Sequence, residues 1–172
     1  MNLIDGLKLE GHLVIEARDF RSGRLIKRID KKNLICQNSW FSIGKLLSQP
    51  SSGDPLEYYR IWAIYVGDSN TAPASSQTGL LGTNTLGVAV TQPISESSNS
   101  SGTVLTLEMT LGTGDFNGNV LRECGIFTRG DADTVPPTTP STSLMLARQV
   151  HSDISKSSSM TVKYTWRYRI YA

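Results

Sequence analysis

The stretch from Ser159 to Tyr171 constrains the fold most, because apolar residues occupy every second position in it. Successive side chains of a β-strand point to opposite faces, so this spacing predicts a long strand with one apolar face. The apolar positions are Met160, Val162, Tyr164, Trp166, Tyr168 and Ile170. The alternate positions are Thr161, Lys163, Thr165, Arg167, Arg169 and Tyr171. We therefore expect a half-buried antiparallel strand whose outer face is polar and basic.

Composition agrees with a chain built mainly from short strands and turns. The 172 residues include 15 Gly, and only 8% are aromatic and 19% charged. A chain of this length can bury a sizeable core as one domain. We expect a mainly β protein, an antiparallel β-sandwich with one short helix, in a single domain over residues 1–172. Residues 1–32 form a possible N-terminal β-hairpin extension, with a turn at residues 20–23.

Five further segments have the short apolar runs that predict strands. They are residues 59–66, 88–91, 103–111, 120–128 and 144–150. The first is apolar on both faces, which predicts an inner strand. Gly125 interrupts the fourth and predicts a bulge or a close neighbour there. The order of the last strands predicts that the final three form an antiparallel meander.

One segment has the spacing of a helix, beginning at Asn38 or Ser39 and ending near Ser48. Its apolar residues are Trp40, Phe41, Ile43, Leu46 and Leu47. We expect this stripe to cover one end of the sheet. The alternative is that the aromatic pair at its start contacts a neighbouring molecule.

Charge is distributed unevenly, although the net charge is only +2. Residues 1–60 carry a net charge of +3, residues 61–121 carry −4 and residues 122–172 carry +3. These charges either neutralise each other within one fold or meet between neighbouring subunits, where they would fix the register of the contact. The small net charge argues against nucleic-acid binding. The basic run from Arg18 to Lys32 contains Asp19 and Asp30, which is typical of a solvated strand face.

The sequence predicts no enzyme, metal site or cofactor. His12 and His151 are the histidines, and no strained G-x-S-x-G elbow accompanies either of them. Residues 115–119 resemble the start of a calcium loop, but the later ligand positions are wrong, so turn chemistry is the better interpretation. Cys36 and Cys124 are expected to be buried free thiols. We also expect no signal peptide and no membrane span, hence synthesis and retention in a cytosol.

Several short motifs in the second two thirds of the chain occur in a recognisable order. They are Ile64-Tyr65-Val66-Gly67-Asp68 with Thr71-Ala72-Pro73 and Leu80, then Arg122-Glu123-Cys124-Gly125-Ile126-Phe127, Leu144-Met145-Leu146-Ala147-Arg148, Lys156, and Tyr164-Thr165-Trp166-Arg167-Tyr168. This order resembles small β-rich virion proteins of tailed bacteriophages, of the tail-fibre, baseplate, collar or neck type. The resemblance covers about residues 33–171. The chain departs from the pattern at Cys124 and in the Pro-rich loop 129–142.

The resemblance implies a non-enzymatic structural component of a phage tail, present in several copies and assembled into the virion in the host cytoplasm. Other tail or neck proteins would be its partners, with a homo-oligomer expected and no nucleic acid or membrane. Subunit contacts are expected from loop 67–102 and from two basic groups. The candidate interface residues are Lys163, Arg167, Arg169, Arg18, Arg21 and Arg24.

Glu123 and Arg148 form a candidate structural pair, since Arg148 would lie on a strand between those of Phe127 and Trp166 in the meander. The main alternative function is a receptor- or carbohydrate-binding module of the tail. Such a module needs exposed aromatic residues on a concave face. Trp40, Trp62 and Trp166 instead fall within apolar patterns, which favours the core.

Overall fold

A computed structural model describes residues 8–47, 56–91, 94–99, 102–129 and 143–171. Its strands are β1 (Lys8–Asp19), β2 (Leu25–Ile35), β3 (Ile61–Gly67), β4 (Thr85–Ala89), β5 (Ser95–Asn99), β6 (Gly102–Leu111), β7 (Val120–Thr128), β8 (Met145–Ser155) and β9 (Met160–Tyr171). The helix α1 spans Asn38–Leu47, and a 3-10 helix η1 spans Leu56–Tyr59. The predicted mainly β class with one short helix is confirmed.

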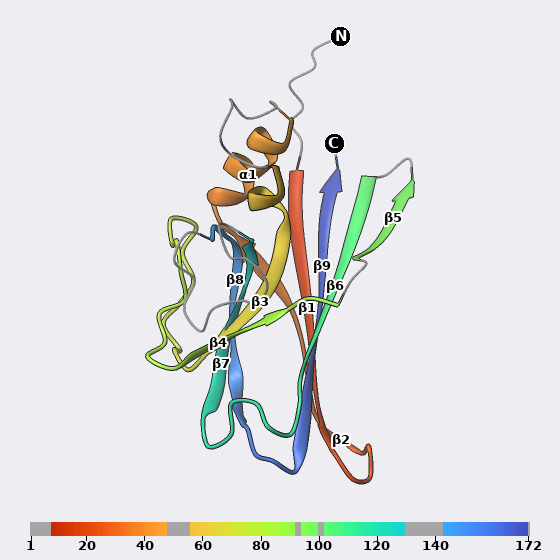
Figure 1. The fold of residues 1–172 in the computed structure, drawn as a ribbon, viewed down its shortest axis with the longest axis vertical. Coiled ribbons are helices and arrows are strands. Elements are labelled where there is room, and N and C mark those ends of the chain that lie inside the picture. The colour runs from red at the N-terminus through yellow and green to blue at the C-terminus, as the bar shows by residue number, and fades with distance from the viewer. Residues whose placement is uncertain (1–7, 48–55, 92–93, 100–101, 130–142, 172) are drawn as a thin grey trace.

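The described strands form one antiparallel sheet that curls into a half-barrel (Figure 1). The strand order is β4-β3-β7-β8-β2-β1-β9-β6-β5. In the strand order, the two halves of the sheet are joined where β2 pairs with β8, at Leu34 with Arg148 and Ile35 with Ala147. Because this link makes the sheet continuous, the two separate sheets of a sandwich are not confirmed.

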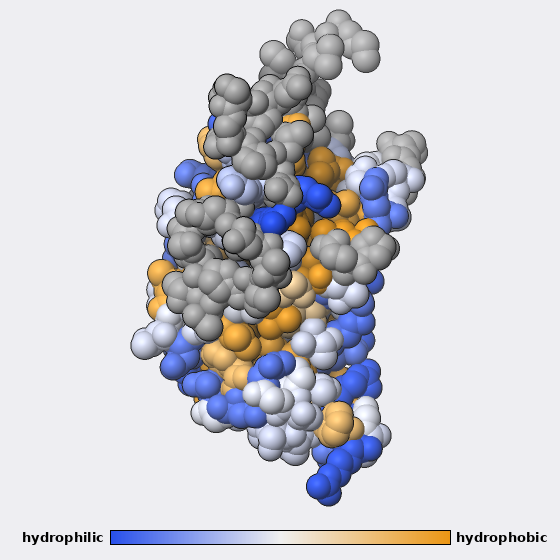
Figure 2. All heavy atoms as spheres, viewed as in Figure 1, coloured by the Kyte–Doolittle hydropathy of each residue, from blue (hydrophilic) through white to orange (hydrophobic). Residues whose placement is uncertain are grey.

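The core lies between the two halves of the curled sheet. From one half it takes Leu13, Leu107 and Trp166, and from the other Ile64 and Ile126, all with no exposed surface. Figure 2 shows apolar residues gathered along the middle of this view, between the two halves. The curl brings β4 near β6, and the N–H of Thr91 donates to the carbonyl of Glu108 at 2.8 Å.

The strand β9 confirms the alternation that was predicted for it. Val162, Tyr164, Trp166 and Tyr168 are buried, while Arg167 between them is exposed. The strand pairs with β1 on one side and β6 on the other, so each of its buried residues has neighbours from two strands.

The predicted meander of the last three strands is wrong. β8 pairs with β7 and β2, whereas β9 pairs with β1 and β6. Phe127 and Trp166 therefore lie in different halves of the sheet, and Phe127 belongs to a second apolar cluster. The physical reason is that β1 pairs with β2 along one edge and offers its other edge to β9, which aligns with it over twelve residue pairs. That partner lies far away in the sequence, beyond the reach of a local pattern.

The predicted hairpin is present, and it is longer than expected. β1 and β2 pair antiparallel from Gly11 with Asn33 to Arg18 with Leu25. Both strands lie inside the strand order, between β9 and β8. Leu13, Ile15 and Ala17 of β1 are buried in the main core, so this hairpin is part of the body of the fold.

The helix α1 lies where the sequence placed it, but the apolar stripe does not cover the sheet as expected. Ser39 and Ser42 are its buried residues, and their hydroxyls donate to the carbonyls of Leu146 and Tyr59. Trp40 and Phe41 are 46% and 52% exposed. The helix therefore contacts β8 and η1 through hydrogen bonds from serine hydroxyls to backbone carbonyls, an interaction that hydrophobic spacing does not encode.

A second, smaller apolar cluster lies on the outer side of β3, β7 and β8. Its buried members are Cys36, Ala63, Tyr65, Phe127 and Met145, and Leu80 of the long loop between β3 and β4 packs against it. The sequence predicted either a bulge or a close neighbour at Gly125, and the structure has the close neighbour. An added Cβ would lie 3.0 Å from the carbonyl oxygen of Ala147.

Neither helix in the described part of the chain has the length and apolar character needed to cross a membrane. The Pro-rich loop at residues 130–142 lies outside the described residues.

Candidate interaction surfaces

Glu123 and Arg148, the pair singled out from the sequence, are in direct contact beneath the loop between β3 and β4. Nη2 and Nε of Arg148 lie 2.7 Å and 2.8 Å from the same Oε2 of Glu123, and both side chains are fully buried. A buried charge is tolerated when its partner and further hydrogen bonds compensate for the lost water. The register places the two residues on the neighbouring strands β7 and β8.

Both members of this pair also hold the loop of residues 68–84. The N–H groups of Leu81 and Gly82 donate to Glu123 Oε1 at 3.2 Å and 2.6 Å. Nη1 of Arg148 donates to Oε1 of Gln77 at 2.9 Å. Three polar groups in this part of the expected interface loop 67–102 are thus bound to the protein's own sheet.

The outer face of β1, β2, β6 and β9 carries many charged side chains, several of them in ion pairs, and we call it the charged face. Three of the six candidate interface residues lie on it, on β9. Lys163 pairs with Glu108 at 2.8 Å, and Nη1 of Arg169 lies 4.0 Å from Glu10. Arg167, between them along the strand, is exposed and has no ion-pair partner among the described residues. Of these pairs, the one between Lys163 and Glu108 joins the basic C-terminal segment to the acidic middle of the chain, as internal neutralisation requires.

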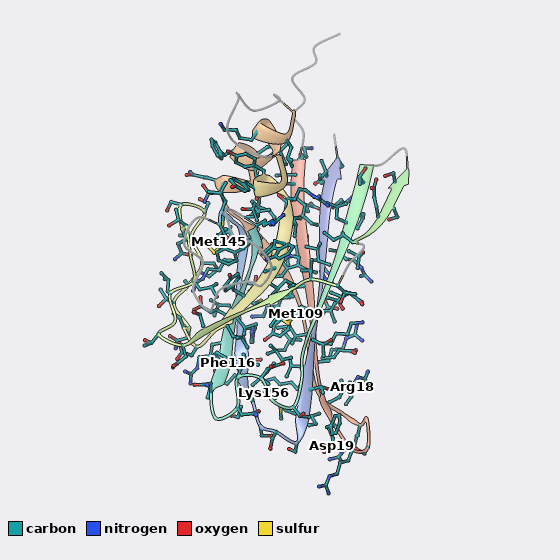
Figure 3. All side chains as sticks on the ribbon, viewed as in Figure 1. Arg18, Asp19, Met109, Phe116, Met145 and Lys156 are labelled. Carbon is teal, nitrogen blue, oxygen red and sulfur yellow. The ribbon has the colours of Figure 1, made fainter. Side chains whose placement is uncertain are left out.

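The other three candidates gather at the β1–β2 turn, which we call the hairpin tip (residues 18–26). Nη2 of Arg18 pairs with Glu16 at 3.0 Å, and its Nη1 donates to the carbonyl of Gly23. Arg21 and Arg24 are exposed. Figure 3 shows Arg18 and Asp19 at the end of the molecule opposite α1.

Exposed apolar side chains accompany the arginines of the hairpin tip. Phe20 is 61% exposed, Leu25 42% and Ile26 50%. The turn itself is rigidly defined, because Asp19 Oδ1 accepts hydrogen bonds from both the N–H and the hydroxyl of Ser22. Large apolar side chains held out in water on a defined turn are typical of a contact surface.

A second exposed apolar group lies on α1, at the other end of the molecule. It consists of Trp40, Phe41 and Leu46, which is 42% exposed. Phe41 packs edge-on against Tyr59, with the Lys45 ammonium 5.5 Å from the Phe41 ring centroid. This exposure corrects the expectation that Trp40 lies in the core, and it leaves both rings accessible to the neighbouring molecule that the alternative expectation required.

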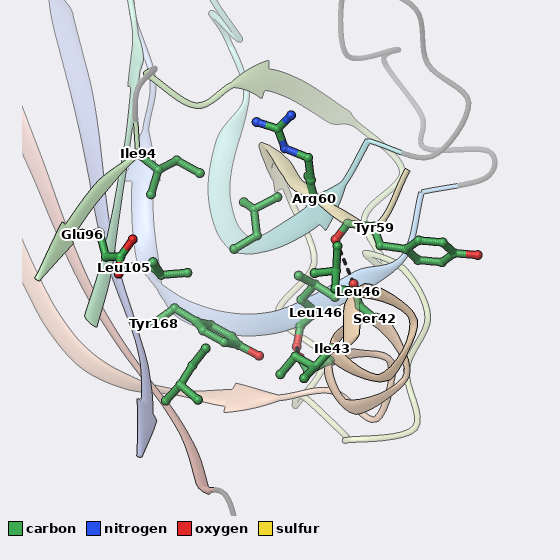
Figure 4. Close-up of a pocket in the computed structure, with 13 residues that line it drawn as sticks. Ser42, Ile43, Leu46, Tyr59, Arg60, Ile94, Glu96, Leu105, Leu146 and Tyr168 are labelled. Carbon is green, nitrogen blue, oxygen red and sulfur yellow. Dashed lines mark hydrogen bonds between the residues drawn. The ribbon is translucent and has the colours of Figure 1, made fainter. Parts of the chain in front are cut away.

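Beside α1 the curled sheet leaves a pocket of about 400 Å³ (Figure 4). Its walls are largely apolar and include Ile43, Leu105 and Ile170. Arg60 and Glu96 supply charges, and the side chain of Tyr168 projects toward α1. Such a pocket fits an apolar side chain or a small apolar ligand.

The possible calcium loop at residues 115–119 is a turn stabilised from within, as its turn chemistry predicted. Asp115 Oδ2 accepts the N–H of Gly112 at 2.7 Å, and Phe116 adopts a φ of 55°. Nζ of the buried Lys156 donates to Asn117 Oδ1 at 3.1 Å, so a cationic side chain already contacts this oxygen. Among the described residues, no cluster of His, Cys, Asp or Glu could hold a metal ion.

The two cysteines are free and buried, as predicted. Burial raises the pKa of Cys36 to about 11, so its thiol stays protonated at neutral pH. His12 lies near the surface, with Nε2 2.6 Å from Asp30. His151 is buried at 4% exposure; its Nδ1 lies 3.1 Å from the carbonyl oxygen of Ser152, and its ring centroid lies 6.2 Å from that of Tyr164.

The buried His151 predicts acid sensitivity. Burial lowers its pKa to about 4, opposed by the Ser152 hydrogen bond and by Asp153 but assisted by Lys27 and Lys31. Between pH 6.5 and 4 the unfolded chain therefore binds more protons at this residue than the folded one. The contribution of neutral His151 to the free energy of unfolding is complete above pH 6.5 and is lost as the pH falls through 4. The total loss is about 3 kcal/mol.

Urea denaturation at pH 7 and pH 4.5 measures this loss. A His151→Gln variant should show a shallower pH dependence than the original chain, while a His12→Gln variant should keep it. An unchanged slope in the His151 variant would contradict the assignment.

Comparison with known proteins identifies no relative. No family model matches the chain, and neither a curated protein nor a solved structure is significantly similar to it.

Proposed function

We propose that this chain is a non-enzymatic structural component of a bacteriophage tail, in the baseplate, fibre attachment or neck, that mediates subunit assembly. The observation that carries the proposal is the hairpin tip, which presents Phe20, Leu25 and Ile26 beside Arg21 and Arg24 on a defined turn. Aromatic residues and arginine are enriched in protein interfaces. The proposed partners are other tail or neck proteins and further copies of this chain, in a virion assembled in the host cytoplasm.

The position of the two apolar groups supports an assembly role over a single binding face. The hairpin tip and α1 lie at opposite ends of the long axis of the molecule (Figure 1). A subunit with different contact surfaces at its two ends can join two neighbours, as a ring or a connector requires. Each surface alone is small, so several copies acting together would give the stable contact.

Light scattering on the purified protein tests this proposal. We expect a discrete homo-oligomer, or capture of tail proteins from an infected-cell lysate. Phe20→Asp and Trp40→Asp should each weaken association about thirtyfold, the cost of losing an aromatic hot spot of about 2 kcal/mol. Leu81→Asp is the matched control, since Leu81 is also an exposed apolar residue at 50% exposure but lies outside both groups.

Mixing the two variants separates copy-to-copy contact from contact with another protein. If the hairpin tip of one copy binds the α1 end of the next, the Phe20→Asp and Trp40→Asp proteins retain one intact contact between them and form a 1:1 dimer. If each end binds a different tail protein, the mixture stays monomeric and each variant loses one captured protein. A stable monomer that captures no tail protein would contradict the assembly role.

A receptor- or carbohydrate-binding module of the tail is the second candidate. The exposure of Trp40 and Phe41 favours it, because sugar rings commonly stack on exposed aromatic residues and a pocket opens beside α1. A monomer that binds host glycan and loses this binding on Trp40→Ala would support this candidate.

A further inference from the structure

A second cavity, of about 520 Å³, lies on the charged face, and its lining contains no residue of the hairpin tip or of the helix α1. The strand register arranges its outward side chains in two adjacent rows across β2, β1, β9 and β6. One row runs Lys32, His12, Arg167, Thr106, and the next runs Glu10, Arg169, Val104. Leu34 lies two residues after Lys32, on the same face of β2. Apart from Thr106, all of these residues line the cavity.

Most charges in and around this cavity have partners. Nε2 of His12 lies 2.6 Å from Asp30. Glu10 lies 4.0 Å from Arg169 and accepts the hydroxyl of Tyr171 at 2.8 Å. Lys32 and Arg167 are the exceptions, because neither has a hydrogen bond or ion pair within the described part of the chain. The cavity therefore holds two uncompensated positive charges.

These two cations flank His12 in the same row. Neighbouring strands lie about 4.8 Å apart, so the Cα atoms of Lys32 on β2 and Arg167 on β9 are about 10 Å apart, a span that their long side chains can close. A guanidinium offers a planar fork of donors to an oxyanion, and an ammonium adds a compact charge. Leu34 and Val104 supply apolar wall beside this row.

The acidic groups at the cavity restrict the kind of anion. Glu10 lines the cavity and Asp30 holds His12 beside it. Two carboxylates repel a polyanion such as a nucleic acid, but a carboxylate accepts hydrogen bonds from hydroxyl groups. The combination suits a molecule with one oxyanion, several hydroxyls and a less polar face.

We propose that this cavity binds an acidic sugar residue. Arg167 and Lys32 hold its carboxylate, Glu10 accepts its hydroxyls, and Leu34 and Val104 contact its less polar face. The volume of about 520 Å³ accommodates a ligand of this size. The inference does not rest on the assembly role, since the residues of the hairpin tip and of α1 do not take part.

The experiment follows amide and side-chain shifts by NMR while methyl glucuronide is titrated into the full chain. We expect saturable, millimolar binding with shifts at His12 and Arg167, and no saturable binding of methyl glucoside or of inorganic phosphate. Arg167→Gln and Lys32→Gln should each weaken binding at least tenfold. Arg24→Gln is the matched control, because it removes the same charge from an exposed arginine outside the cavity.

Three results would overturn the proposal: no saturable binding, equal binding of phosphate or methyl glucoside, or an equal loss on Arg24→Gln. The spectra report folding of each variant in the same experiment. Light scattering of Arg167→Gln keeps this test separate from the assembly proposal, since the variant should lose sugar binding and retain the mass of the original protein.

Discussion

Arg148→Ala is expected to lower the free energy of unfolding by about 3–5 kcal/mol, because it leaves the Glu123 carboxylate buried without its counter-ion. The two side chains have no exposed surface, and two nitrogens of Arg148 contact one carboxylate oxygen. The variant also removes the hydrogen bond from Arg148 to Gln77 in the loop of residues 68–84. Chemical denaturation with urea at pH 7 measures the change.

An exposed ion pair provides the matched control for this variant. Lys163 and Glu108 lie 2.8 Å apart with side chains 44% and 41% exposed, so Lys163→Ala should cost at most about 1 kcal/mol. Hydrogen exchange gives a local readout, since the N–H groups of Leu81 and Gly82 should exchange faster in Arg148→Ala than in the control. A loss below about 1 kcal/mol in Arg148→Ala would show that the pair contributes little to stability.

Trp166→Ala is expected to cost about 3–5 kcal/mol, since it opens a large cavity where β9 joins β1 and β6. Trp166 is fully buried, and its register partners Leu13 and Leu107 are also fully buried. The rigid pairing of three strands limits how far the surroundings can collapse into the space. Thermal and urea denaturation should both show the loss.

Two further variants test whether this loss of stability comes from the buried volume of Trp166. Trp166→Phe keeps most of the volume and should cost much less, because the indole N–H has no hydrogen-bond partner in the described structure. Trp40→Ala removes the same side chain from a site that is 46% exposed and should change stability by less than about 1 kcal/mol. Similar losses for Trp166→Ala and Trp40→Ala would contradict the burial assignments.

Most of the strands and the helix could be predicted from the sequence because each depends on a local period. The strand β5 was missed, because its polar residues have no such period. The alternation from Met160 to Ile170 predicts one solvent-exposed face and one buried face, and it does so whichever strands lie beside it. The start of α1 at Asn38 and the turn at Gly23, with a φ of 68°, are equally local. Local chemistry therefore predicted where most elements begin and end.

The partners of each strand could not be predicted in the same way. β8 and β9 are consecutive, yet each pairs with a strand of the N-terminal hairpin, which no local pattern reveals. The orientation of α1 was also missed, because it depends on hydroxyls of Ser39 and Ser42 reaching particular carbonyls. Both features arise from contacts between segments distant in the sequence.

Some residues of the candidate sites could likewise be predicted from local sequence patterns, and others could not. Motif order brought Glu123 and Arg148 together, although the loop that they hold was expected to face a neighbour. The arginines of the hairpin tip were singled out by charge, whereas the exposure of Phe20 beside them was not. The row of Lys32, His12 and Arg167 joins three strands, so only the register of β1 against its two neighbours reveals it.

The pairing of β1 with β9 has a consequence for how the protein is made. Among the described strands, β1 is synthesised before all others and β9 after them, yet the two align along twelve residue pairs. Until β9 emerges, β1 and β6 each present an unpaired edge and the apolar faces of the sheet lack Tyr164 and Trp166. Native folding of this half must therefore wait until β9 has been synthesised, and the growing chain is most prone to aggregate just before that point.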